Sequence, residues 1–148
     1  MIPTSPLQLN LSAFTDVRIS AQPDGDVSAK IQTKIGYNAR VHAQDNRQWQ
    51  VTVRVSLDQH GQTKPVYLGS VECIGLFSVS QEWPSGEIEK LVVVNGVGII
   101  YGIIREMISN ITARGAWPMI TLPTQSFIAA YDQSKRTKEP SAMVTVSP

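Results

Sequence analysis

Apolar and polar residues alternate with a period of two through most of the first half of the chain, and this pattern constrains the fold more than any other feature of the sequence. In residues 29–41 the odd-numbered positions are mostly apolar and the even-numbered positions are mostly polar, and residues 49–57 repeat the pattern. Such alternation predicts antiparallel strands with one buried face and one face in water. Two less regular strands are expected at Leu7–Ala21 and Val66–Ser80, with turns at residues 23–25, 45–46 and 60–61.

The period changes in the second half of the chain. From Gly98 onward, apolar residues recur at the spacing of a helix, which ends at Arg114 and Gly115 with a basic last turn and a glycine stop. The apolar positions are Ile99, Ile100, Ile103, Ile104, Met107, Ile108 and Ile111. The pattern therefore predicts one long helix after the strands.

The residues after this helix predict a link and a second helix. Pro118 and Pro123 bracket an apolar, non-helical link, and Thr124 could cap a helix that extends to about Lys135. Strands followed by helices predict an α+β fold: a four-stranded antiparallel sheet with a long helix and a second helix on one face. Residues 1–137 are expected to form a single domain, and residues 138–148 a flexible tail with two prolines and small polar residues.

The bulk composition excludes several classes of protein. A net charge of +1 gives no electrostatic argument for binding nucleic acid or an anionic membrane. Cys73 is the single cysteine, so an intrachain disulfide and a cysteine metal cluster are impossible, which favours a reducing compartment such as the cytoplasm. The apolar run Leu91–Ile104 is shorter than the roughly 20 residues that a membrane span needs. It predicts a buried helix without membrane insertion, and residues 1–10 do not have the pattern of a secretory signal.

The inventory of catalytic groups is poor. His42 lies on the polar face of a predicted strand and His60 in a turn, where solvated histidines are expected. The glycines of residues 96–102 lack the spacing and the lysine of a phosphate-binding loop, and no metal-ligand spacing is present. Cys73 shares the parity of Phe77 in a strand, which predicts a buried, inert thiol. The chain is therefore not expected to be an enzyme or to bind a metal or cofactor.

Two stretches carry a recognisable pattern of residue types. Residues 71–78 contain Val-x-x-x-Gly-x-Phe-Ser, and residues 104–127 contain an Arg-Glu pair, an Ile-Ser, an Arg-Gly, an aromatic-Pro, a Leu-x-Pro and a Phe at fixed spacing. These stretches resemble the end of the fourth strand, and the long helix with its crossover link, in the SecB family of export chaperones. The resemblance extends from Leu9 to Tyr131. It implies an ATP-independent holdase, a non-catalytic cytoplasmic chaperone that binds unfolded or pre-export polypeptides in apolar grooves and passes them to a partner.

The crossover link is where the resemblance places client binding. The Arg-Gly stop and the two prolines hold the link out of a helix, so its apolar side chains cannot all turn inward. An open groove can then form between the link, the second helix and a strand. The candidate client-binding residues are Trp117, Met119, Ile120, Leu122, Phe127 and Tyr131. The alternative is that the apolar side chains of the link pack into the core of the domain itself.

The resemblance also implies assembly into a homotetramer, a dimer of dimers whose long helices lie between two eight-stranded sheets. Small residues one turn apart on a helix permit close helix–helix approach. The helix stripe is also too apolar for the surface of a monomer. The candidate interface residues are Gly98, Ile99, Gly102, Ile103, Met107 and Ile111.

The outer face of the sheet departs from the family pattern. In the family this face is acidic and docks the C-terminal zinc-binding tail of the SecA motor. Asp16, Leu68 and Glu72 are the candidate docking residues, but Ser20 and Ser70 stand where acids are expected. The same face has gained basic residues, namely Arg18, Lys30, Lys34, Arg40 and Arg54. Weak SecA binding is therefore expected.

Two further functions stay open from the sequence. One is a SecB-like chaperone dedicated to a single client, such as an antitoxin. The other is a structural or adaptor oligomer that has kept the fold and lost client binding. The sequence does not name the client.

Overall fold

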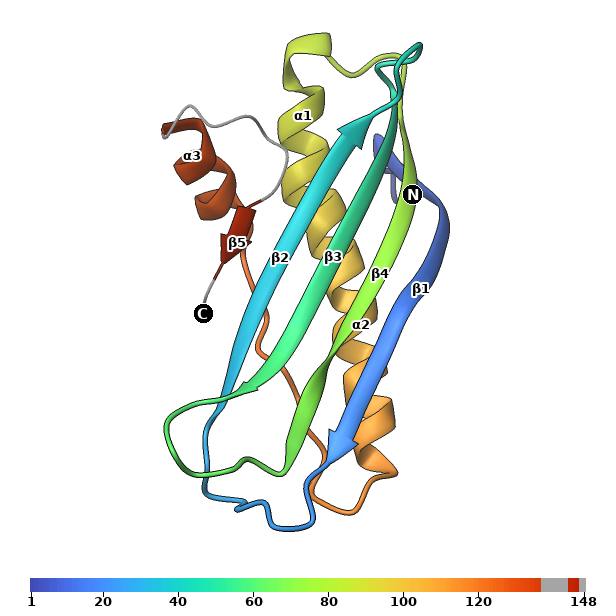
Figure 1. Cartoon of the computed structure of the whole chain (residues 1–148). Coiled ribbons are helices and arrows are strands. Elements are labelled where there is room, and N and C mark those ends of the chain that lie inside the picture. The colour runs from blue at the N-terminus through green and yellow to red at the C-terminus, as the bar shows by residue number, and fades with distance from the viewer. Residues whose placement is uncertain (137–143, 147–148) are drawn as a thin grey trace.

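The computed structural model describes residues 1–136 and 144–146. Four long strands form one antiparallel sheet, and they are β1 (Leu7–Ala21), β2 (Ile31–Val41), β3 (Gln48–Gln59) and β4 (Tyr67–Val79). The spatial order is β1-β4-β3-β2-β5, and the long helix crosses one face of the sheet (Figure 1). This architecture confirms the predicted α+β fold of four antiparallel strands, a long helix and a second helix.

Burial in the sheet follows the alternation of the sequence. In β3, Val51, Val53 and Val55 are fully buried, while Thr52 and Arg54 between them are only half-buried. The three valines belong to one core cluster with residues of the long helix, so the apolar side of the sheet is the side that faces the helix. Each fully buried aliphatic side chain contributes about 1.5–3 kcal/mol to stability. The opposite, polar side of the sheet is left facing outward.

The long helical segment is continuous from Ile88 to Ala113. It comprises α1 (Ile88–Leu91), a π-helical turn (Val92–Gly96) and α2 (Val97–Ala113), and a 3₁₀ turn (Ser85–Glu87) precedes it. Two glycines allow it to pack closely on the sheet. A Cβ atom on Gly75 would lie 2.5 Å from Ile100 Cδ1, and one on Gly96 would lie 3.4 Å from Val51 Cγ2. The absence of side chains at these two positions sets the close spacing between helix and sheet.

By length and composition alone, the helical stretch Ser85–Ala113 could cross a membrane. Half of its most apolar window is buried inside the fold, and Val92, Val97, Ile100 and Ile104 are fully buried. Core helices of soluble proteins satisfy the same criteria of length and composition. The burial agrees with the buried helix predicted from the sequence.

The second helix, α3 (Ile128–Arg136), begins later than the sequence pattern predicts. Thr124 does not cap it, because Thr124 Oγ1 instead accepts a hydrogen bond from Arg105 Nη1 at 3.0 Å. The first helical bond runs from the Tyr131 N–H to the Phe127 carbonyl oxygen at 3.0 Å. The Phe127 ring packs edge-on against Tyr101, which holds the preceding residues against α2 in a non-helical conformation.

A short strand, β5 (Val144–Val146), pairs antiparallel with β2 and adds a fifth strand to the sheet. The sequence pattern does not predict this strand, since it falls in the segment expected to be a flexible tail. The other residues of that tail, 138–143 and 147–148, lie outside the described residues.

Candidate functional site

Tyr67 fastens the start of the crossover link, residues 114–127, to the end of the sheet. Its Oη atom accepts a hydrogen bond from the Trp117 N–H at 3.1 Å and lies 3.1 Å from the Trp117 carbonyl oxygen. Gly115 packs directly on the phenol, since a Cβ atom there would lie 2.1 Å from Tyr67 Oη. The Trp117 indole Nε1 donates to the Gln22 carbonyl at 3.0 Å, which ties the link to the turn after β1.

The middle of the link is fastened to α2 by side chains that bond its backbone. Thr112 Oγ1 accepts a hydrogen bond from the Ile120 N–H at 2.9 Å, and Ser109 Oγ donates to the Ile120 carbonyl at 3.0 Å. Further along, Tyr101 Oη donates to the Pro123 carbonyl at 2.6 Å. Backbone groups away from regular structure need such partners when they are shielded from water. These bonds explain how an extended apolar segment can be ordered along the helix.

The structure divides the six candidate client-binding residues into three groups by exposure. Leu122 and Phe127 are buried and belong to the core, as the alternative interpretation proposes for the link. Met119 is 55% exposed. Trp117, Ile120 and Tyr131 are half-buried, and the last two pack against the core while presenting part of their surface outward.

The link also borders two surface hollows. One, of about 370 Å³, lies between Pro123 and the start of β2 and is lined by Ile31, Thr33 and His60. The other, of about 680 Å³, lies between the link and α2 and is lined by Gly102, Arg105 and residues 121–124. Both hollows have mixed linings, which include Glu106 and Ser109 in the larger one and Lys30 and Gln32 in the smaller one.

Ile128 is an exposed apolar residue that the sequence reasoning missed. It is the first residue of α3 and is 51% exposed. The link has no periodic pattern, so the sequence gives no signal that Ile128 is exposed while the adjacent Phe127 is buried. Ile128 and Met119 are the large apolar side chains that the link and α3 leave most exposed among the described residues.

The six candidate interface residues of α2 lie outside its buried face. Ile100, Ile104 and Ile108 are fully buried against the sheet, whereas Ile99 is 40% exposed. The other five candidates, Gly98, Gly102, Ile103, Met107 and Ile111, are half-buried.

β1 also leaves apolar side chains uncovered on the helix-facing side. Phe14 and Val17 are exposed, although their register partners, Cys73 and Val71, are buried. The helix-facing side of the chain thus has apolar surface that its own elements do not cover.

The three candidate docking residues lie together on the outer face of the sheet. Asp16 is the register partner of Glu72, and Leu68 is the register partner of Ser20. The structure therefore brings Asp16, Leu68 and Glu72 onto adjacent strands, along one β1–β4 ladder. Leu68 is half-buried.

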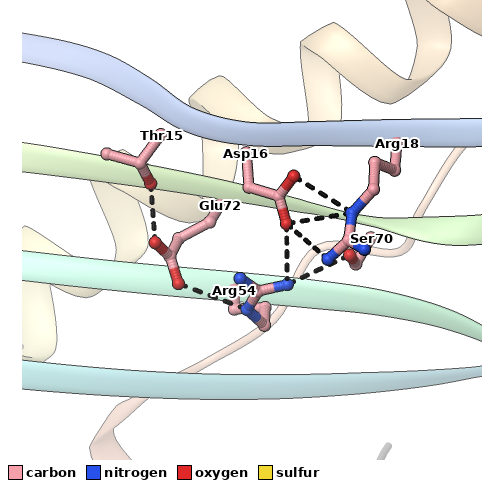
Figure 2. A network of polar contacts seen from close by, with 6 residues as sticks. All are labelled: Thr15, Asp16, Arg18, Arg54, Ser70 and Glu72. Atoms are coloured by element: carbon pink, nitrogen blue, oxygen red, sulfur yellow. Dashed lines mark hydrogen bonds and ion pairs between the residues drawn. The ribbon is translucent and has the colours of Figure 1, made fainter.

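Both carboxylates of this cluster are already paired within the chain (Figure 2). Arg54 Nη1 contacts Asp16 Oδ2 at 3.2 Å, and Arg54 Nε contacts Glu72 Oε2 at 3.2 Å, so one guanidinium bridges the two acids. Arg18 Nη2 adds a second contact to Asp16 at 2.8 Å, and Thr15 Oγ1 donates to Glu72 at 2.6 Å. The negative charge that the sequence retains on this face is thus largely neutralised by neighbouring side chains.

The hydrogen bonds from Arg18, with a smaller contribution from Arg54, hold the pKa of Asp16 below its ordinary value of 3.8. A carboxylate whose pKa is depressed on folding stabilises the folded state above the unfolded pKa. That contribution is lost as the pH falls through the folded pKa. The Asp16 carboxylate is therefore ionised at neutral pH.

The single cysteine is buried and the two histidines are exposed in the part of the chain that the structure describes. Cys73 is fully buried, and burial raises the pKa of its thiol, which disfavours the nucleophilic thiolate. His42 and His60 are exposed, and they lie on different loops. No cluster of three or more His, Cys, Asp or Glu side chains is placed to hold a metal ion among the described residues.

Comparison with known proteins gives a consistent family. The family model described as "Preprotein translocase subunit SecB" matches residues 16–138. A protein-export protein SecB from Hyphomonas neptunium is 23% identical over 114 residues, which cover 77% of this chain and 68% of the relative. The corresponding protein from Ruegeria pomeroyi is 20% identical over 121 residues, with coverage of 80% and 72%.

A solved structure shows the same fold. It is the SecB-like chaperone of Mycobacterium tuberculosis in complex with a peptide from an antitoxin, with a TM-score of 0.56 and 18% identity. The match covers 82% of this chain and 91% of that one. Because the family model matches residues 16–138, which make up most of the chain, the chain belongs to the SecB family.

Proposed function

We propose that the protein is an ATP-independent holdase chaperone, which binds unfolded or pre-export polypeptides along the crossover link and releases them to a partner. The observation that carries this proposal is the exposure of Met119 and Ile128 beside the half-buried Ile120 and Tyr131, on a backbone that hydrogen bonds hold in place. The names of the SecB relatives and the antitoxin peptide bound to the Mycobacterium tuberculosis chaperone support it. The cytoplasm, where unfolded precursors occur, is the proposed location.

The energetics of such a surface suit a holdase. Burying one client side chain the size of leucine or phenylalanine contributes about 1.5–3 kcal/mol. A few such anchors, after the costs of ordering the client, give roughly micromolar affinity for each groove. Several grooves in one assembly raise the overall affinity without making any single contact strong. Weak individual contacts allow release without nucleotide hydrolysis.

The test is suppression of the aggregation of a model client by the purified protein, with and without ATP. We expect suppression to be independent of ATP. The double substitution Met119→Ser/Ile128→Ser should weaken client affinity about tenfold or more, because it removes two apolar anchors. The matched control is Leu11→Ser/Leu76→Ser, which removes two exposed apolar side chains that are register partners on the outer face of the sheet. Equal losses in both double variants, or a requirement for ATP, would contradict the proposal.

Two alternative functions each have one supporting observation. A chaperone dedicated to one client is favoured by the antitoxin peptide bound to the Mycobacterium tuberculosis chaperone. An adaptor that has lost client binding is favoured by the burial of Leu122 and Phe127 in the core. An environment-sensitive apolar dye separates the adaptor from either chaperone, because a closed surface would leave the dye unbound. The dedicated chaperone would suppress aggregation of its own client and fail with unrelated ones.

We also propose that the protein acts as a homotetramer, a dimer of dimers. The exposed Ile99 on α2 and the exposed Phe14 and Val17 on β1 support this proposal, because a monomer in water would leave this apolar surface uncovered. The half-buried Gly98 and Gly102 are small enough to permit a second helix to approach closely. Several client sites per assembly would follow.

Docking to SecA is proposed to be weak. Truncating one charged partner of an interface pair typically weakens binding by a few kcal/mol. Ser20 and Ser70 stand where the family pattern has two acids, so two such partners are missing. The retained Asp16 and Glu72 support the proposal further, because Arg54 already occupies both carboxylates. A basic tail peptide would have to compete with this guanidinium.

Titration of the host's SecA tail peptide into variants of the protein tests this proposal. Ser20→Glu/Ser70→Glu should bind the peptide at least about tenfold more tightly than the unaltered protein. Arg54→Gln should also tighten binding, because it frees Asp16 and Glu72. Arg40→Gln is the matched control, since it removes one positive charge from the exposed polar side of β2 without touching either acid. Submicromolar binding by the unaltered protein, unchanged in all three variants, would show that this face does not govern docking.

A further inference from the structure

A hollow of about 470 Å³ lies at the end of the sheet where β2 passes into β3 (Figure 1, upper end of β2). Its lining includes Arg40, His42, Gln48, Gln50 and Leu76, and none of the described residues that line it is acidic. The volume falls within the range of roughly 300–1,000 Å³ that is usual for small-molecule sites. This hollow is separate from the ion-pair cluster of Asp16, Arg54 and Glu72, because it shares no residue with that cluster.

The strand register places the lining residues in a row across the outer face. Arg40 of β2 is the register partner of Gln50, Gln50 is the partner of Leu76, and Leu76 is the partner of Leu11 on β1. Neighbouring strands are about 4.8 Å apart, so this row places Leu76 about 10 Å from Arg40. Both leucines are exposed. The row therefore runs from a cation to an apolar surface that nothing in the described chain covers.

Arg40 differs from the other arginines of the outer face. Arg18 and Arg54 are paired with the carboxylates of Asp16 and Glu72. Arg40 is exposed, and it forms no ion pair or side-chain hydrogen bond with another residue in the described part of the chain. A guanidinium is a planar donor group whose geometry matches a carboxylate. Arg40 is therefore free to bind a carboxylate from outside the chain.

His42 and two glutamines add neutral donors to the hollow. The His42 N–H donates to the Gln48 carbonyl oxygen at 2.8 Å, which continues the β2–β3 pairing beyond the last residue of β2. The His42 Nδ1 atom accepts a hydrogen bond from the Gln44 N–H at 3.1 Å, so the neutral imidazole carries its hydrogen on Nε2. The side-chain amides of Gln48 and Gln50 form no hydrogen bond with any other described residue. The hollow thus combines one guanidinium with several unused hydrogen-bond donors.

We propose that this hollow binds an amphipathic anion, namely a carboxylate on an unbranched apolar chain, the chemistry of a medium-chain fatty acid. The carboxylate pairs with Arg40 and accepts a hydrogen bond from His42, and the apolar chain lies along the row over Leu76 and Leu11. An uncharged amphiphile would leave Arg40 unpaired, and a small carboxylate would leave the leucines uncovered. The site lies on the side of the sheet opposite α2, and it does not depend on the proposed holdase function.

The test is a titration of octanoate into the full-length protein, followed through the NMR signals of isotope-labelled histidine side chains. The chain has two histidines. His42 lines this hollow, whereas His60 lines the hollow beside Pro123 of the crossover link and serves as the internal reference. We expect octanoate to shift the His42 signals in a saturable way and to leave the His60 signals unchanged. Octanol and acetate should each bind at least about tenfold more weakly than octanoate.

Substitutions separate the charged end of the site from its apolar end. Arg40→Gln should weaken octanoate binding at least about tenfold, because it removes the charge-assisted hydrogen bonds to the carboxylate. Lys34→Gln is the matched control, since it removes one exposed positive charge from the same face of the same strand outside the hollow. It should change the affinity less than about twofold. Leu76→Ser should weaken the binding of octanoate and leave that of acetate unchanged.

Three outcomes would overturn the proposal. Equal losses in Arg40→Gln and Lys34→Gln would show a general attraction of anions to this face without a site. Equal affinity for octanoate and acetate would show that the exposed leucines take no part. A shift of the His60 signals in place of the His42 signals would locate the bound octanoate at the crossover link.

Discussion

Replacing Phe77 with alanine is expected to lower the free energy of unfolding by about 3–5 kcal/mol, the usual cost of truncating a large buried aromatic side chain. Phe77 is fully buried and belongs to the core cluster between the sheet and the long helix. Its ring lies beside the spaces at Gly75 and Gly96, where added Cβ atoms would contact it. Since these glycines have no side chains that could fill the cavity, relaxation around the missing ring should be small. Urea denaturation at a fixed protein concentration measures the change.

The adjacent residue supplies the control for this prediction. Leu76 points to the outer face of the sheet and is 39% exposed. Leu76→Ala should therefore cost less than about 1 kcal/mol, because a partly exposed side chain loses little burial. If the two neighbouring substitutions cost the same, the assignment of the helix-facing side of β4 would be wrong.

Replacing Gly69 with alanine is expected to destabilise the pairing of β1 with β4 strongly. Gly69 has a φ of +149°, in the region that favours glycine, and a Cβ atom there would lie 1.8 Å from the carbonyl oxygen of Arg18. The clash is with backbone, so no side-chain rotation can relieve it, and the two strands must separate locally. We expect a loss of at least about 3 kcal/mol, the upper range for a strained backbone position. Thermal unfolding and hydrogen exchange across the β1–β4 ladder measure the effect.

The substitution Gly61→Ala separates the two causes of destabilisation at Gly69, namely the positive φ and the clash of a Cβ atom with the backbone. Gly61 also has a positive φ, +81°, but nothing lies within 4 Å of the position that its Cβ atom would take. Its replacement should lower the free energy of unfolding only by the cost of placing a residue with a Cβ atom at a positive φ, about 1–2 kcal/mol. A Gly69→Ala variant that is no less stable than Gly61→Ala would show that the β1–β4 pairing is not tight at Arg18.

The Gly69 prediction also bears on the outer face. Asp16 and Arg18 belong to β1, Ser70 and Glu72 belong to β4, and Arg54 reaches both acids from β3. Opening the β1–β4 ladder at Gly69 should therefore loosen the ion-pair cluster as well. The neutralisation of the acids on this face therefore depends on strand pairing and not only on which residues are present.

Regular periodicity determined the four long strands and the long helix from the sequence alone, and two stretches of fixed residue types determined the resemblance to the family. The alternation in residues 49–57 predicted which valines of β3 are buried, because successive side chains of a strand point to opposite faces. The helical spacing of the apolar residues from Ile99 to Ile111 predicted the helix itself, and the structure shows that Ile100, Ile104 and Ile108 are the ones buried against the sheet. The fixed residues of the two SecB-like stretches predicted the family, which the family model confirms.

Tertiary contacts decided which apolar residues of the link are exposed. The link has no period, so its sequence treats Met119, Leu122 and Phe127 alike, yet Met119 is exposed and the other two are buried. The difference arises because Tyr67 and Thr112 orient the link. These two residues lie far apart in the sequence, but Tyr67 Oη lies 3.3 Å from the Thr112 carbonyl oxygen. The same is true of Arg54 between Asp16 and Glu72 and of β5 on β2. Local periodicity specifies which face of an element is apolar, but only long-range pairing brings separate elements together and so determines which side chains meet and which remain accessible.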